Sequence, residues 1–204
     1  MGMYKIMIKP NPLKVLIYLL IPLFYSIFFT ISISANSLHG LSLYGPKNLK
    51  YKIDQPYEYS NPDAIKGGHL VLADFGAFTK LNPSSLKGVA APGIDSLIFQ
   101  TAMDSSADDN EPFSQYGSLV EKVILADDRM TMIYHIRKNA LFSDGHPVTA
   151  DDFIFSYNLL KDPEYHPFYK QYFKDIKSVE KIDSHKIKYT FSIYNQELPL
   201  ITGQ

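Results

Sequence analysis

The stretch LVEKVILADDRMTMIYHIRKNALFSDGHPVTADDFIFSYNLL, residues 119–160, decides the fold. Two largely apolar runs, residues 118–125 and 130–137, flank the short polar connector Ala126–Arg129. Runs of this length around four polar residues are typical of an antiparallel hairpin. The second run carries apolar side chains on both of its faces, so we expect it to be covered on each side.

The segment that follows the hairpin has the signals of a turn and a helix start. Ser143–Pro147 predicts a turn, in which an aspartate bonds its own backbone and a glycine takes a positive φ. Thr149 is placed to cap a helix, and Asp152, three residues later, completes an acidic form of the capping box. Pro163 ends the helix. The adjacent carboxylates of Asp151 and Asp152 therefore have a structural explanation at the positive helix start.

Three further elements follow from hydrophobic patterns. Residues 69–73 come after two glycines and form an unbroken apolar run, which predicts a buried strand. Apolar residues spaced three and four apart in 93–103 predict a core helix. Strict alternation over 186–193 predicts a strand whose odd-numbered residues face the core. Helical and strand patterns mixed in this way indicate a mixed α/β fold.

Composition excludes several classes of function. The chain has no cysteine, a net charge of −1, 15 Tyr and 13 Phe. An exported chain without disulfides is typical of the bacterial periplasm, and a nearly neutral charge does not favour nucleic acid as a partner. The tyrosines are expected to fill the core more often than a binding cleft.

No catalytic, metal or cofactor site is predicted. The nucleophile elbow, the zinc-binding helix and the phosphate-binding loop are not found in the sequence. The acidic cluster 104–111 fails the calcium-loop template, since Asp109 replaces the required glycine and Gln115 the final carboxylate. We therefore expect a solvated loop there.

The amino terminus has the pattern of an export signal. Three lysines precede the uncharged run Val15–Ile33, and small residues follow it. This run is also nearly as long as the roughly 20 residues that cross a bilayer. Residues 1–35 are therefore predicted to be either a signal peptide or a membrane anchor.

Four strings, taken together with the junction Asn61–Gly68, resemble the extracellular solute-binding proteins, family 5, including its microcin C-type branch. The strings are Asp127–Arg129, Tyr134–Arg137, Phe142–Asp152 and Phe153–Tyr157. The resemblance covers about residues 61–204 and implies a mixed α+β lobe of the type 2 periplasmic binding proteins. Because family members have two lobes, we expect residues 69–204 to form an incomplete lobe, after an extended lead-in over 36–68.

The resemblance also implies a function and a site. Family members bind peptides for ABC importers without covalent chemistry, so this chain is expected to be a truncated periplasmic binding component for peptides or peptide-like compounds. Its partners would be that ligand, an inner-membrane permease and a separately encoded remainder of the protein. Carried over by position, the ligand-binding residues are Phe75, Gly76, Ala77 and Phe99. Several relatives carry an acidic residue at the position of Phe75, so a charge contact would be lost here. A single partial lobe is expected to bind weakly or not at all.

Other classes of function stay open from the sequence. One alternative is a membrane-anchored, non-functional remnant or interaction protein held by Val15–Ile33. A second is a periplasmic hydrolase whose second carboxylate lies outside the pairs Asp127–Asp128 and Asp151–Asp152.

Overall fold

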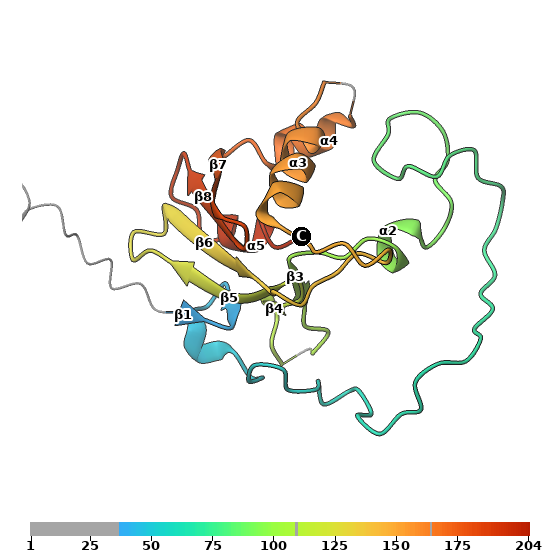
Figure 1. Cartoon of the computed structure of the whole chain (residues 1–204), viewed down its shortest axis with the longest axis horizontal. Coiled ribbons are helices and arrows are strands. Elements are labelled where there is room, and N and C mark those ends of the chain that lie inside the picture. Colours follow the sequence, from blue (N-terminus) through green and yellow to red (C-terminus); the bar gives the residue numbers. More distant parts are fainter. Residues whose placement is uncertain (1–36, 109, 164) are drawn as a thin grey trace, which may run out of the picture. The chain divides into compact units, whose positions relative to one another are not determined.

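The computed structural model describes residues 37–108, 110–163 and 165–204 (Figure 1). The predicted signal or anchor, residues 1–35, lies outside the described residues. Within the described ranges, no helix has both the length and the apolar character needed to cross a bilayer.

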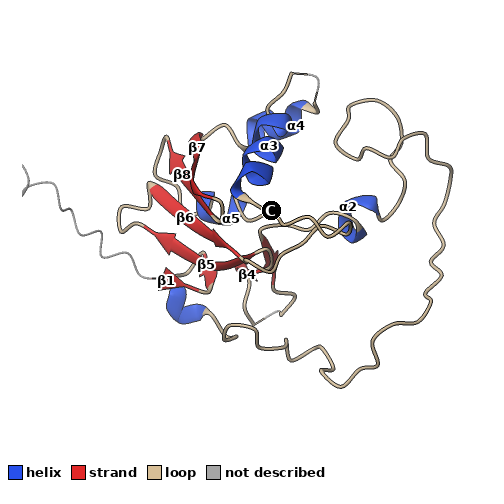
Figure 2. Ribbon diagram, viewed as in Figure 1, coloured by secondary structure: helices blue, strands red, loops and turns tan. Residues whose placement is uncertain are grey.

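Five antiparallel strands form the main sheet, in the order β1-β5-β6-β8-β7 (Figure 2). The predicted hairpin is confirmed as β5, Val120–Leu125, paired with β6, Thr131–Ile136. The predicted strand at 186–193 is also confirmed: β8, Lys186–Phe191, lies between β6 and β7, Ile176–Asp183. The short β1, Ser37–Leu38, pairs with β5.

Alternation along the two central strands produces the core. The even-numbered side chains of β6 and the odd-numbered side chains of β8 are buried, while their neighbours along each strand are only half-buried. Both faces of β6 are therefore covered to some extent, but only one of them is fully buried. The aromatic rings of Tyr134 and Tyr189 meet edge to face at 5.5 Å, and the hydroxyl of Tyr134 hydrogen-bonds Thr202 Oγ1 at 3.0 Å. Removal from water raises the pKa of both phenols.

Three helices follow the hairpin, and the first begins where the sequence predicts. They are α3, Ala150–Leu160, α4, Pro167–Tyr172, and α5, Leu198–Ile201. The backbone N–H of Thr149 donates to Asp152 Oδ2 at 2.7 Å, which confirms the capping box. Helix α3 packs on β7 and β8 through the half-buried side chains of Phe153, Ile154, Tyr157 and Leu160.

A second, smaller sheet has the order β2-β4-β3. Its strands are β2, Gly40–Ser42, β4, Ser114–Gly117, and β3, Met103–Ser105, and a 3₁₀ turn, η1, spans Pro46–Asn48. Gly117 connects this sheet to β5. A Cβ there would lie 2.0 Å from the carbonyl oxygen of Val120, so the close approach of the two backbones requires glycine.

Two predictions made from apolar patterns are wrong. Residues 69–73 form no strand, and α2 is one short exposed turn, Ile94–Leu97, rather than a core helix over 93–103. The apolar pattern identifies residues that favour burial, but a strand also needs neighbours for its backbone N–H and C=O groups. No described strand pairs with residues 69–73. An apolar run is therefore not sufficient to form a strand at residues 69–73.

Ion pairs and hydrogen bonds fasten the lead-in to the acidic cluster. Lys50 Nζ lies 2.6 Å from Asp108 Oδ2 and 2.7 Å from Glu58 Oε2. The hydroxyl of Tyr51 donates to the same Asp108 oxygen at 2.8 Å. Glu111 is buried and accepts from the backbone N–H of Lys50 at 2.7 Å and from the hydroxyl of Tyr116. The prediction of a solvated loop over 104–111 is therefore wrong at Asp108 and Glu111, because both carboxylates have partners from distant segments.

We predict that Asp152→Ala lowers the free energy of unfolding by about 1 kcal/mol, the usual cost of losing a helix cap. Asp151→Ala is the matched control, since it removes the same charge from the same helix turn. Asp151 is exposed, and its pairing with Lys181 Nζ at 2.5 Å is a surface ion pair worth about 0–1 kcal/mol. Urea denaturation measures both variants, and equal losses would contradict the capping role of Asp152.

The Lys50 contact also predicts a pH dependence. The hydrogen bond from Lys50, with support from the N–H of Asn110 and the hydroxyl of Tyr51, lowers the pKa of Asp108. A lowered folded-state pKa stabilises the fold above the unfolded pKa of about 4, and this contribution is lost as pH falls towards the folded-state pKa. Asp108→Asn should therefore destabilise the protein at pH 7, and its deficit relative to wild type should shrink between pH 5 and pH 2.

The control for this effect is a double-mutant cycle with Lys50→Met. The double variant should be little worse than either single variant at pH 7, because both substitutions remove the same interaction. Thermal unfolding across the pH range measures the deficit. A deficit that stays constant with pH would show that Asp108 acts through packing and not through its charge.

Candidate functional site

The four ligand-binding residues predicted from the sequence lie on exposed backbone. Phe75 is fully exposed and Phe99, just beyond α2, is 61% exposed. Gly76 has a φ of 99°, and a Cβ built there would meet no atom within 4 Å. Neither of the two pockets described below is lined by any of the four residues. Their role in binding stays a prediction.

The larger of these pockets lies between the lead-in and the small sheet and has a volume of about 360 Å³. The rings of Tyr51, Tyr57 and Tyr116 form one part of its wall, with mutual centroid distances of 4.9–5.9 Å in edge-to-face pairs. Tyr57 also stacks on Tyr59 at 5.0 Å. Burial raises the pKa of Tyr57 to about 12, and burial together with the Glu111 hydrogen bond raises the pKa of Tyr116. These hydroxyls are therefore neutral donors at physiological pH.

Charged side chains on the rim of the same pocket form an ion pair and hydrogen bonds within the protein. Arg137 Nη2 pairs with Asp54 Oδ1 at 3.0 Å, and Arg137 Nε donates to the carbonyl oxygen of Ser118 at 2.8 Å. A third bond joins Arg137 Nη2 to the carbonyl oxygen of Gly117 at 3.2 Å. The arginine thus ties β6 to the loop before β5 and to the lead-in. Its hydrogen bonds indicate a structural role.

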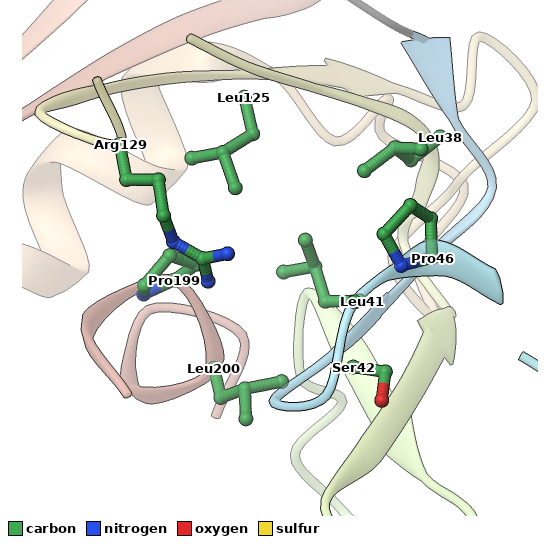
Figure 3. A pocket seen from close by; sticks show the side chains of 9 residues that line it. Leu38, Leu41, Ser42, Pro46, Leu125, Arg129, Pro199 and Leu200 are labelled. Atoms are coloured by element: carbon green, nitrogen blue, oxygen red, sulfur yellow. The ribbon is translucent and has the colours of Figure 1, made fainter. Parts of the chain in front are cut away.

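The second pocket is small and apolar (Figure 3). Side chains from β1, β2, β5 and α5 surround a volume of about 20 Å³, namely Leu38, Leu41, Leu125, Pro199 and Leu200. Arg129 projects over it and donates from Nη2 to the carbonyl oxygen of Gln196 at 3.3 Å. A space of this size holds one water molecule and no larger ligand.

Metal chemistry has no visible basis in the described ranges. There, no group of three or more His, Asp or Glu side chains is arranged to hold a metal ion. Carboxylates that are adjacent in the sequence also make separate structural contacts. Asp151 pairs with Lys181, Asp152 caps α3, and Asp128 Oδ1 accepts from the backbone N–H of Met130 at 2.9 Å.

The tyrosine pocket was not predicted from the sequence. Its lining comes from residues 39, 51–57, 60, 104, 116–117 and 137, which are distant along the chain. The only sequence signal for this pocket was the abundance of tyrosine, and that abundance predicted core positions more than a binding cleft. Tyr51 is almost fully buried, as that preference predicts, but its ring lines the pocket together with that of Tyr57.

Comparison with curated proteins shows related binding proteins that are much longer than this chain. A peptidoglycan-binding protein, YepA, of Agrobacterium fabrum is 37% identical over 175 residues, which cover 82% of this chain and 28% of the relative. A probable peptide-binding protein, YejA, of the same organism is 37% identical over 149 residues, covering 72% and 24%. The chain thus spans about a quarter of the length of the curated relatives it matches.

Solved structures show the same fold at low identity. The oligopeptide-binding protein AppA of Bacillus subtilis, in complex with a nonapeptide, is 19% identical with a TM-score of 0.50, over 63% of this chain and 24% of its own. NikZ of Campylobacter jejuni, in complex with Ni(L-His), is 22% identical with a TM-score of 0.51, over 63% and 25%. Both likenesses confirm the mixed α/β fold. In each case, this chain covers about a quarter of the solved chain.

A family profile matches the part of the chain that contains the hairpin, the turn, α3 and β8. Residues 115–202 match the profile described as "Bacterial extracellular solute-binding proteins, family 5 Middle". This is the same family that the hairpin, the Asp-Gly turn and the capped helix indicate from sequence. Residues 115–202 carry the family's middle region, and the chain belongs to the bacterial extracellular solute-binding proteins of family 5.

Proposed function

We propose that this chain is part of a binding protein that captures peptides or peptide-like compounds outside the cytoplasmic membrane for an ABC importer. The observation that carries the proposal is the 37% identity to two relatives named for binding peptidoglycan and peptides. AppA, which has the same fold, is in complex with a nonapeptide, so this fold is compatible with a peptide ligand. NikZ holds Ni(L-His) on the same fold, so the fold alone does not select the ligand.

The exposed loop Asp74–Ala77 has features that suit a peptide ligand. An extended peptide is held largely through main-chain hydrogen bonds, while side-chain pockets tolerate variety. Gly76 leaves its backbone open to close approach, and the Phe75 ring beside it is free to cover an apolar side chain. Asp74 Oδ1 accepts from the Phe75 N–H at 2.7 Å, which shapes the loop without using these surfaces.

The rest of the family's length is required for affinity in this proposal. Binding proteins of this kind close two lobes around the ligand by a hinge motion. Residues 37–204 supply only some of the surfaces that would bury a peptide. Handing the ligand to a permease also depends on the complete protein.

The test is a chimera in which residues 36–204 replace the corresponding part of the Agrobacterium fabrum YepA protein. Isothermal titration with mixed oligopeptides and with peptidoglycan-derived peptides should show binding by the chimera and weak or no binding by the isolated chain. Phe75→Ala and Phe99→Ala should each weaken binding by about tenfold, since buried aromatic anchors dominate such contacts. Phe155→Ala is the matched control, because Phe155 is a phenylalanine on α3 whose 66% exposure is close to the 61% of Phe99.

Two outcomes would overturn parts of the proposal. A folded chimera that binds neither class of peptide would refute the peptide assignment. A chimera whose Phe75→Ala and Phe99→Ala variants bind as tightly as the Phe155→Ala variant would refute the predicted site. Circular dichroism establishes that each variant is folded before titration.

A further inference from the structure

The most exposed apolar stretch of the described chain is residues 61–79, here called the open segment. Every residue of the open segment is exposed, and it contains neither helix nor strand (Figure 1). Leu70, Val71 and Leu72 are 80%, 78% and 71% exposed. By contrast, Val120 and Val123 of β5 are completely buried. The chain therefore buries its β-forming apolar residues elsewhere and leaves these three in solvent.

The sequence of the open segment favours a central strand. Its apolar run includes neighbouring residues, which point to opposite faces of a strand. Leu70 and Leu72 would lie on one face and Val71 on the other, so a strand here has to be covered on both faces. Its backbone N–H and C=O groups also need neighbours along both edges. No described strand supplies either edge.

A second copy of this chain would be a poor partner for the open segment. Two open segments paired with each other would form a two-stranded ribbon, which is marginally stable in water and leaves both faces uncovered. The length of the relatives indicates a better partner. A match over 82% of this chain includes the open segment, and it uses only 28% of YepA. The other 72% of such a protein is available to provide strands and an apolar cover.

We propose that the open segment is a docking strand for a polypeptide that carries the remainder of the family 5 fold. Residues 69–73 pair through their backbone with strands of that polypeptide, by strand addition. Further exposed apolar side chains near the strand, Ile65, Phe75 and Phe78, extend the apolar surface that such a partner would cover. The proposal rests on membership of the family and not on the peptide ligand.

The experiment uses the remainder of Agrobacterium fabrum YepA, without the matched region, as the probe. Coexpression with this chain should give a stable 1:1 complex in size-exclusion chromatography with light scattering. Amide hydrogen exchange at residues 69–73 should be slower in the complex than in the isolated chain by at least about tenfold, because the strand's N–H groups become hydrogen-bonded.

Two substitutions distinguish strand docking from nonspecific hydrophobic association. Val71→Asp should weaken the complex by at least about tenfold, since it places a charge in a covered strand. Phe155→Asp makes a similar change at a comparably exposed apolar residue on α3 and should leave the affinity unchanged. Both residues are exposed in this structure, so both variants should keep the circular dichroism and thermal unfolding of the wild type.

The following outcomes would each overturn the proposal. Failure to form a complex, or a complex in which 69–73 exchanges as fast as before, refutes strand docking. A homodimer that forms through the open segment and excludes the probe assigns the surface to a second copy. If the covalent chimera binds peptides while the separate chains do not associate, docking fails and the proposed function stands.

Discussion

The antiparallel pairing of β6 with β8 is the interaction on which the described fold depends. β6 is joined to β5 by a four-residue turn, whereas β8 comes about fifty residues later, after the turn, α3, α4 and β7. Their pairing sets Met132 and Tyr134 beside Ile187 and Tyr189 in one buried layer. A shift by one residue would turn these side chains to the outer face, so the hydrophobic layer specifies the register. Every other element of the main sheet, and α3 across it, takes its position from this pair.

Local rules predicted the elements whose partners are near them in sequence. The β5–β6 hairpin needs only its own turn, and α3 needs only Thr149 and Asp152 at its start. The strand β8 was recognisable from its period of two because one of its faces is buried and the other is not. In each case the information lies within a dozen residues. The Asp144–His146 turn is similar, since Asp144 Oδ1 accepts from the N–H of His146 at 3.0 Å.

Failures occurred where a residue's environment depends on distant chain. Asp108 and Glu111 look like solvated acids, yet Lys50 and Tyr51 reach them from almost sixty residues away. The local sequence pattern carries no information about such a distant partner. The opposite error occurred at residues 69–73, where the apolar run predicted a strand but the described residues form none and offer it no partner strand. The tyrosine pocket was missed for the first reason, because its wall combines segments that are distant along the chain.

These two kinds of failure have different meanings for function. Long-range contacts such as Lys50 with Asp108 are satisfied and therefore belong to the stability of this part of the fold. The open segment is different, because its apolar side chains are exposed to solvent and residues 69–73 pair with no described strand. Phe75 and Gly76, the predicted ligand contacts, follow residues 69–73 of that segment closely in sequence. Residues 69–73 pair with no described strand, whereas a binding loop has to be held by a rigid scaffold. Pairing of residues 69–73 would therefore be the step that positions the loop for a ligand, so strand docking and ligand binding are expected to be thermodynamically coupled.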